Sequence, residues 1–238
     1  MSLDHVKALT FDVFGTVVDW RNSIAREAES ALAPKGYALD WLAFADAWRG
    51  RYQPSMQRIR SGERGFTKLD ILHRENLEEI LPDFGVSGLS EDELDRLNRA
   101  WHRLTPWPDA PAGLARLKSK YIIATQSNGN IALMVNMAKN GGLPWDVILG
   151  AEVCQAYKPM PEAYQRAAAA LGLAPEECMM TAAHNDDLKA AAAQGFRTAF
   201  VPRPTEYGPG QTKDLAADPS IDIAADSFIE LADKLGCP

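Results

Sequence analysis

The stretch from Val6 to Val17 constrains the fold more than any other part of the chain. Its first half, up to Phe11, is mostly apolar and is typical of a buried β-strand. One carboxylate, Asp12, follows the strand, and Gly15 then lets the backbone turn. In open α/β sheets, chemistry lies beyond the carboxyl ends of the strands, so this position predicts Asp12 as a nucleophile.

Further strand-like runs alternate with helical patterns in the second half of the chain. Alternation of this kind indicates parallel βαβ units, and continuous apolar runs indicate strands covered on both faces. The sequence therefore predicts a Rossmann-like, doubly wound parallel sheet. The expected strands are 121–125, 147–150, 178–181 and 197–201, and the expected helices are 130–140, 161–171 and 187–194.

The segment between the first strand and the rest of the sheet differs in character. It contains helical patterns over 24–33, 41–60, 68–80 and 91–104, and no convincing strand. Ser90 is expected to cap the last of these helices, with Glu91 and Asp92 in its first turn. We therefore expect a catalytic core of residues 1–17 and 106–238, interrupted by a helical insertion over 18–105.

Composition excludes several classes of function. The net charge is −7, and no basic cluster free of acids is present, which argues against a nucleic-acid partner. No apolar run reaches the roughly 18 residues of a membrane span, and the segment from Met1 to Lys7 lacks the apolar centre of a signal peptide. Three scattered cysteines are too few for a disulfide framework. We expect no membrane association and a cytoplasmic location.

Four groups of polar residues follow successive predicted strands. Each alone has a plain structural explanation, as a helix cap, a turn or a surface loop. Together, at one edge of a parallel sheet, they indicate an active site. The groups are Asp12 with Thr16, Ser127-Asn128-Gly129, Lys158-Pro159, and His184-Asn185-Asp186-Asp187.

This constellation resembles the haloacid dehalogenase superfamily over essentially the whole chain. The run Asp12-Val13-Phe14-Gly15-Thr16 matches its nucleophile motif, and Ser127-Asn128-Gly129 matches its second motif. Tyr157-Lys158-Pro159 matches the third motif, and Asp187 matches the carboxylate of the fourth. The helical insertion after the first strand matches the cap of the same families.

Two substitutions narrow the resemblance. Phosphatases of the superfamily carry an Asp two residues after the nucleophile and a pair of acids in the fourth motif that helps to hold Mg²⁺. Here Phe14 stands at the first position, and Ala183 replaces the first acid of the pair. Mg²⁺ prefers oxygen ligands in near-octahedral geometry, so this set of ligands is poor. The chain is similar to the metal-independent L-2-haloacid dehalogenases, which implies no metal and no cofactor.

The resemblance implies a two-step hydrolysis. Asp12 would displace halide from carbon to give an aspartyl ester, and water would then attack the ester carbonyl and release a 2-hydroxy acid. Lys158 would keep Asp12 ionised. Arg49 resembles the family's cap arginine that accepts the halide, with Asn128 as its amide partner. Phe66 is a candidate for the apolar wall of that halide site.

The other expected site residues hold the small carboxylic acid substrate or the water. Ser127 and the backbone N–H groups near Val13 and Phe14 would bind the substrate carboxylate, and Trp20 follows closely enough to line the pocket. Thr16 and Tyr164 are further candidates for contact with the substrate, and Tyr164 matches a family tyrosine near Lys158. Asp187 would orient the water or position Lys158. His184 departs from the family pattern, and an imidazole can act as a base near neutral pH.

Alternatives remain at each level. Arg49 could be a surface residue bonded to Asp46 or Glu63, and His184 could be a packed histidine. The protein could be a Mg²⁺-dependent phosphatase that uses Asp12, the loop after it, Asp186 and Asp187. It could also be a catalytically silent protein that binds a small acid on this fold. The resemblance further implies a homodimer.

Overall fold

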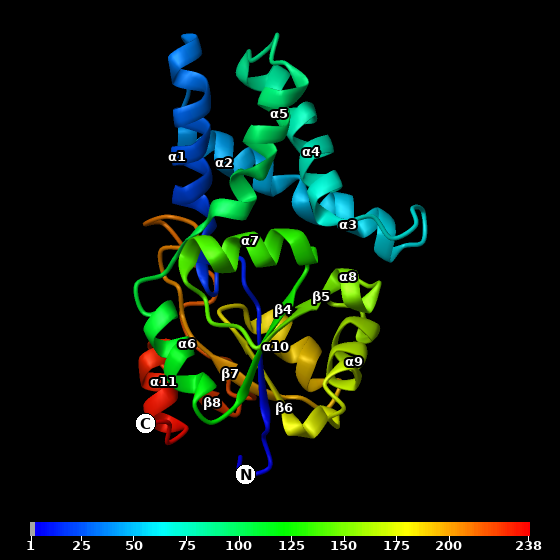
Figure 1. Cartoon of the computed structure of the whole chain (residues 1–238), viewed down its shortest axis with the longest axis vertical. Coiled ribbons are helices and arrows are strands. Elements are labelled where there is room, and N and C mark those ends of the chain that lie inside the picture. The colour runs from blue at the N-terminus through cyan, green and yellow to red at the C-terminus, as the bar shows by residue number, and fades with distance from the viewer. Residues whose placement is uncertain (1–2) are drawn as a thin grey trace.

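The computed structural model describes residues 3–238 and contains a parallel sheet of six strands in the order β5-β4-β1-β6-β7-β8. β1 lies inside the sheet, with β4 on one side and β6 on the other. Helices cover both faces of the sheet (Figure 1). The strands are β1 (Ala8–Phe11), β4 (Ile122–Ser127), β5 (Val147–Gly150), β6 (Cys178–Ala182), β7 (Arg197–Phe200) and β8 (Ile223–Ala224).

Side chains of β1 alternate between two apolar cores, because successive residues of a strand point to opposite faces. Leu9 and Phe11 belong to the larger core, which also holds Phe228 of α11. Ala8 belongs to a second core with Tyr164 of α9. The core helices are α6 (Ala110–Lys118), α7 (Ile131–Gly141), α8 (Ala151–Cys154), α9 (Pro161–Ala170), α10 (Asn185–Ala192) and α11 (Phe228–Lys234), with the short η4 (Pro175–Glu177).

A helical segment, residues 20–103, lies beyond the carboxyl ends of the strands (Figure 1). The chain enters it through β2 (Val18–Asp19) and leaves it through β3 (Thr105–Pro106), and these two strands pair antiparallel. The two connections between the sheet and the helical segment are therefore side by side. The segment contains α1 (Trp20–Leu32), η1 (Ala33–Lys35), α2 (Trp41–Gly50), α3 (Tyr52–Arg60), α4 (Leu69–Ile80), η2 (Leu81–Phe84), α5 (Glu91–Asn98) and η3 (Arg99–Arg103).

The predicted fold class is confirmed, and all five expected strands are present. The expectation of one helix over 41–60 is wrong, because α2 ends at Gly50 and α3 begins at Tyr52. Pro54 has no N–H to donate to the carbonyl of Gly50, so a continuous helix would lack that hydrogen bond. The short strands β2, β3 and β8 and the helices α6 and α11 were not anticipated. Residues 1 and 2 of the predicted core lie outside the described residues.

The expected helix cap at Ser90 is confirmed. Its side chain accepts a hydrogen bond from the backbone N–H of Glu93 at 3.4 Å, and Ser90 N–H donates to the Glu93 carboxylate at 2.9 Å. This reciprocal pair satisfies two donors at the start of α5. None of the helices within residues 3–238 combines the length and the apolar character that a membrane crossing needs.

Phe14 joins the loop after β1 to the helical segment. Its buried ring makes edge contacts with Trp101 at 6.0 Å and with Tyr52 and His73 at 6.3 Å, measured between ring centroids. Aromatic pairs in this range contribute beyond the area that they bury. The aromatic residue that replaces a second carboxylate therefore holds the nucleophile loop against the helices.

Substitution of Gly113 by Ala tests the packing of α6 on α11. A Cβ at this position would lie 2.4 Å from the Cβ of Phe228 and 2.7 Å from its backbone carbonyl carbon. We expect G113A to lower the free energy of unfolding by about 1–3 kcal/mol in urea titrations. Gly50, at the end of α2, has open space at its Cβ position, so G50A is the matched control and should not destabilise. Equal midpoints for the two variants would contradict the packing described here.

Candidate active site

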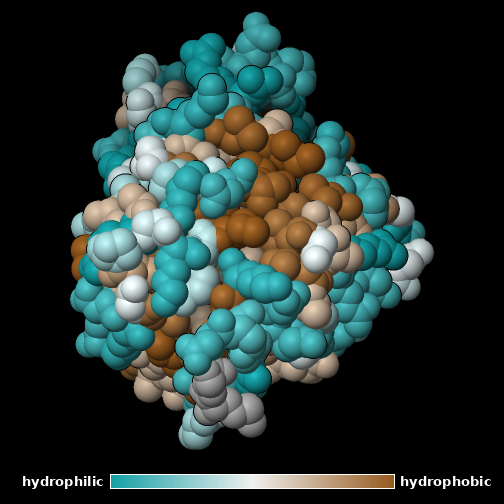
Figure 2. Space-filling view, turned by 60° about the horizontal axis from the view of Figure 1, so that its bottom comes forward, coloured by the Kyte–Doolittle hydropathy of each residue, from teal (hydrophilic) through white to brown (hydrophobic). Residues whose placement is uncertain are grey.

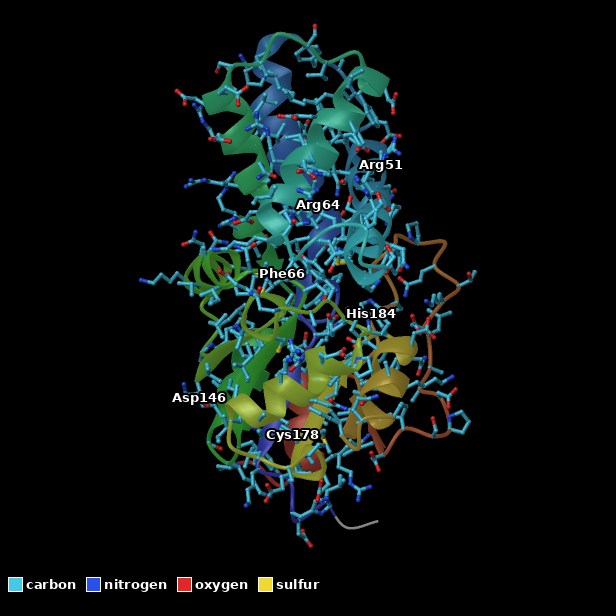
Figure 3. All side chains as sticks on the ribbon, turned by 90° about the vertical axis from the view of Figure 1, so that its right-hand side faces the viewer. Arg51, Arg64, Phe66, Asp146, Cys178 and His184 are labelled. Atoms are coloured by element: carbon cyan, nitrogen blue, oxygen red, sulfur yellow. The ribbon has the colours of Figure 1, made fainter. Side chains whose placement is uncertain are left out.

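A cavity of about 620 Å³ lies between the carboxyl ends of the strands and the helical segment. Figure 3 shows the direction of the strands: Cys178, where β6 begins, lies low in the core, and His184, just beyond its end, lies near the helical segment. The core contributes Asp12, Phe14, Asn128, Lys158, Pro159, Met160, Tyr164, His184, Asp186, Asp187, Tyr207 and Lys213 to the lining, and the helical segment contributes Arg49, Tyr52, Gln53, Gln57 and Arg60.

Asp12 is a buried carboxylate at the centre of this site. Its Oδ1 accepts a hydrogen bond from Lys158 Nζ at 2.9 Å, and its Oδ2 accepts one from Thr16 Oγ1 at 2.7 Å. His184 Nδ1 lies 3.2 Å from the same Oδ2. Thr16 is itself fixed, because its hydroxyl oxygen accepts the backbone N–H of Ala183 at 2.9 Å. The carboxylate is thus oriented by three side chains from three different strand ends.

Lys158 bridges two carboxylates. Its Nζ pairs with Asp187 as well as with Asp12, and the side chain is 8% exposed. The hydroxyl of Tyr164 donates to the other oxygen of Asp187 at 2.6 Å. This arrangement supports the positioning of Lys158 that was expected of Asp187. Tyr164, expected as a substrate contact, lines the cavity and also binds Asp187.

His184 bridges Asp12 to a second buried acid, Glu206. His184 Nε2 lies 2.8 Å from Glu206 Oε2, and Trp20 Nε1 donates to Glu206 Oε1 at 3.0 Å. Glu206 is 1% exposed. His184 therefore does more than pack: it connects two carboxylates at the wall of the cavity.

The charges of these groups stabilise one another. Burial alone would raise the pKa of Asp12, but the charges of Lys158 and His184, with hydrogen bonds from His184 and Thr16, lower it well below its usual value. Burial alone would lower the pKa of Lys158, and Asp12 and Asp187 raise it instead. Burial also opposes protonation of His184, yet the carboxylates of Glu206 and Asp12 raise its pKa to about 10. These shifts favour an ionised Asp12 and a protonated His184 at neutral pH.

Arg49 faces the cavity from α2. Its guanidinium lies 3.9 Å from the ring centroid of Tyr52, 5.4 Å from that of Trp20 and 5.6 Å from that of Phe14. Arg49 Nη1 is buried without a hydrogen-bond partner within residues 3–238. The alternative of a surface residue bonded to Asp46 or Glu63 is wrong. Those two acids bind Arg21 and Arg58, each at 2.7 Å.

Two polar residues expected to bind the substrate accept hydrogen bonds from backbone N–H groups. Asn128 lines the cavity, and its Oδ1 accepts the backbone N–H of Lys158 at 2.8 Å, which leaves its Nδ2 for a ligand. Ser127 Oγ accepts the backbone N–H of Gly129 at 3.1 Å and is 1% exposed, and it is absent from the lining of this cavity.

Three expected contact residues lie behind the cavity wall instead of in it. Thr16 orients Asp12, and Trp20, which is 1% exposed, binds Glu206. Phe66 stacks on Tyr157, with ring centroids 5.5 Å apart, and is not part of the lining. Figure 3 shows Phe66 apart from His184, at the lower end of the helical segment. Among the aromatic rings around Arg49, that of Tyr52 is nearest, and Tyr52 lines the cavity.

The carboxylates that a Mg²⁺ site would need are not gathered. Asp186 is 78% exposed on its side chain and pairs with Lys213 at 3.0 Å. Asp187 is engaged by Lys158 and Tyr164. Within residues 3–238, no group of three or more His, Cys, Asp or Glu side chains is arranged to hold a metal ion.

Comparison with known proteins decides the family. The family model for haloacid dehalogenase-like hydrolases matches residues 6–195. The chain belongs to this family. It is 32% identical over 214 residues to (S)-2-haloacid dehalogenase 4A of Burkholderia cepacia, which covers 86% of this chain and 88% of that protein. The predicted family is therefore confirmed.

Solved structures agree with this assignment. The crystal structure of a defluorinating L-2-haloacid dehalogenase superposes with a TM-score of 0.96 at 53% identity, over 98% of this chain and 96% of that one. A second L-2-haloacid dehalogenase structure has a TM-score of 0.93 at 46% identity, over 97% and 99% of the two chains.

Glu206 is the main site residue that the sequence did not reveal. It lies in the loop after β7, so the rule that strand ends carry function could have found it. Glu206 packs directly against Gly15. The φ angle of Gly15 is +87°, and a Cβ on this residue would lie 2.0 Å from Glu206 Oε1. Tyr52 and Arg60, which come from α3, were also missed. Arg60 donates only to neutral oxygens, including the carbonyl of Lys158 at 3.2 Å.

The raised pKa of His184 predicts a pH dependence of stability. A cation with a folded-state pKa of about 10 contributes stability that is fully present below its unfolded-state pKa of about 6.5 and is lost as the pH rises through about 10. The difference in unfolding free energy between the wild type and H184Q should therefore shrink across this window, by on the order of a few kcal/mol. A difference that stays constant with pH would contradict the charged state described here.

Proposed function

We propose that the protein hydrolyses a small (S)-2-haloacid to a 2-hydroxy acid through a covalent ester on Asp12, without a metal ion. The observation that carries the proposal is an ionised, oriented carboxylate facing an arginine that has no anionic partner among residues 3–238. The haloacid dehalogenases among its relatives support the same chemistry. Phe14 supports it as well, because an aromatic ring cannot protonate a leaving alcohol as a phosphatase acid would.

The first half-reaction forms the ester. An oxygen of Asp12 attacks the halogen-bearing carbon, the new C–O bond forms, and the C–halogen electron pair leaves with the halide. Halide needs donors and no proton, and Arg49 and the Nδ2 group of Asn128 supply them at the cavity wall. Stacking on Tyr52 fixes the plane of the Arg49 guanidinium before substrate arrives.

The substrate carboxylate is the second recognition element. We assign it to the backbone N–H groups of Val13 and Phe14 at the turn after β1. Ser127, predicted for the same role, is buried and absent from the lining of the cavity, so it is left out of this assignment. Lys158 adds positive charge from the same side of the site. The cavity of about 620 Å³ has room for an acid larger than one of two or three carbons.

The second half-reaction breaks the ester. Water adds to the Asp12 carbonyl carbon, the bond to the product oxygen breaks, and the carboxylate returns. Asp187 and Tyr164 hold Lys158 at hydrogen-bond distance from Asp12, where its charge stabilises the developing oxyanion. The helical segment excludes bulk water from these steps, which strengthens the electrostatic contacts.

We extend the proposal to organisation and location. The division into a core of residues 1–17 and 106–238 and a cap of 18–105 stays our prediction, as does a homodimer. Figure 2 shows apolar residues gathered on the upper part of one face, and such an area suits a contact with a second copy. A cytoplasmic location is consistent with the free thiols of all three cysteines.

Isotope labelling tests the ester directly. A single turnover in ¹⁸O water should place the label in Asp12 and leave the product unlabelled, as measured by mass spectrometry of the peptide that contains Asp12. D12N should lower halide release by at least about 10⁴-fold, because the nucleophile is lost. Asp92 is exposed in α5, so D92N is the control that should behave as wild type. Label in the product after one turnover would overturn the ester mechanism.

Chelation separates this function from a phosphatase. Halide release from chloro-, bromo- or fluoroacids should be the same with and without EDTA, and turnover of p-nitrophenyl phosphate should be absent in both conditions. The reason is that Asp186 pairs with Lys213 and does not complete a metal site with Asp12. Mg²⁺-dependent phosphate release, with no halide from any of the acids, would favour the phosphatase instead.

A further inference from the structure

Asp12, His184 and Glu206 form a continuous hydrogen-bonded row. His184 Nδ1 lies 3.2 Å from Asp12 Oδ2, and His184 Nε2 lies 2.8 Å from Glu206 Oε2. A nucleophile within hydrogen-bond reach of a base, which is oriented in turn by a third group, is the general geometry of an activated two-step hydrolase. His184 also lines the cavity, so a water molecule beside Asp12 would be within its reach.

We propose that His184 is the base of the second half-reaction, taking a proton from the water that hydrolyses the Asp12 ester, and that Glu206 positions His184 for this step. The proposal rests on the function proposed above. His184 would touch the reacting water, whereas Glu206 acts through His184.

The other groups around Asp12 are less suited to accept this proton. Lys158 is held protonated between two carboxylates and can only donate. Both oxygens of Asp187 are already occupied, one by Lys158 and the other by the Tyr164 hydroxyl. Lys158 also lies between Asp187 and Asp12, whereas His184 Nδ1 lies directly beside Asp12, which favours His184 as the base.

The charge on Asp12 controls whether His184 can serve as a base. In the resting site the imidazole is protonated, because it lies between two carboxylates. Ester formation neutralises Asp12, so one of the two anions that hold the proton disappears. Of the other charged groups around the cavity, four cations disfavour the imidazolium, namely Arg49, Arg60, Lys158 and Lys213, and the carboxylates of Asp186 and Asp187 favour it. With Asp12 neutral, His184 can release its proton to solvent and present a lone pair on Nδ1.

The atoms of the hydrolytic step then balance. Water adds its oxygen to the Asp12 carbonyl carbon, and its proton moves to His184. The C–O bond to the product breaks, and His184 returns the proton to the leaving alkoxide, which departs as the 2-hydroxy acid. The new carboxylic acid on Asp12 then protonates His184 and restores the resting ion pair. Each cycle consumes one water and yields one halide and one proton, the latter released when the ester forms.

Glu206 is fixed in a way that suits a positioning residue. Its side chain is 1% exposed, and Trp20 Nε1 donates to the oxygen that His184 does not use. A Cβ on Gly15 would lie 2.0–2.8 Å from the three terminal atoms of this carboxylate, so the nucleophile loop is shaped around it. A buried carboxylate held on both oxygens keeps the imidazole ring in one orientation, with Nδ1 directed at Asp12.

Rapid-mixing experiments on His184 variants test the base. With the best haloacid substrate, H184Q should release one halide per site in a burst and then stop, and intact-protein mass spectrometry should show the ester on Asp12. We expect ester hydrolysis to slow by at least about 100-fold, with ester formation changed far less. Glutamine can still donate an N–H to Asp12 but cannot accept the proton from water. Added imidazole should restore ester hydrolysis in H184A, and H5Q is the matched control outside the cavity.

Variants of Glu206 test the positioning role. E206Q should slow ester hydrolysis by about 10-fold or more relative to ester formation, and E206D should recover part of the loss. The pH profile of ester hydrolysis should shift to lower pH in E206Q, because the imidazole loses a neighbouring anion. A merely structural defect would slow both steps together and leave this profile in place. E79Q, exposed in α4, is the control.

The outcomes separate this proposal from the function on which it rests. Ester hydrolysis at the wild-type rate in H184Q would overturn the base assignment and leave the dehalogenase function standing. Loss of the halide burst itself in H184Q would also overturn it, since His184 would then act in ester formation. Absence of halide release by the folded wild type from every acid tested would overturn the proposed function.

Discussion

A buried row of alternating charges organises this molecule. Lone charges would be costly to bury, and a buried pair is favourable only when hydrogen bonds satisfy its remaining atoms. Both ends of the row are closed by neutral donors, Trp20 Nε1 at one end and the Tyr164 hydroxyl at the other. Its members come from the carboxyl ends of four strands or from the loops and helices after them, because His184 and Asp187 both follow β6. The members, in order, are Glu206, His184, Asp12, Lys158 and Asp187.

The row also explains why the nucleophile acts on carbon. Lys158 and His184 hold Asp12 ionised, which suits direct attack, and both lie beside Asp12 and not at the opposite wall of the cavity. That wall consists of Phe14 and Tyr52, with the Arg49 guanidinium over their rings. An apolar wall around one cation accepts a halide well, because a halide needs charge and a few donors but no proton. One face of the cavity thus holds the nucleophile, and the opposite face suits the leaving group.

The sequence predicted the parts of the site that follow from one rule. Strand ends of a parallel sheet converge, so this rule alone groups the nucleophile with Lys158, Asp187 and His184. Glu206 was missed because it lies six residues beyond Phe200, where β7 ends, and not directly at the strand end. Residues from the helical segment were harder still, since a helix surface offers several candidate faces. There the family resemblance indicated Arg49, which lines the cavity, and Phe66, which does not.

Arg49 has one further consequence. Its buried Nη1 lacks a hydrogen-bond partner among the described residues, and an unsatisfied buried donor destabilises a fold. An anion bound at the guanidinium would therefore stabilise the fold. A residue such as Met would fit the same aromatic surroundings without that cost. Selection for stability alone would remove this arginine, so its presence marks a compromise between thermodynamic stability and turnover.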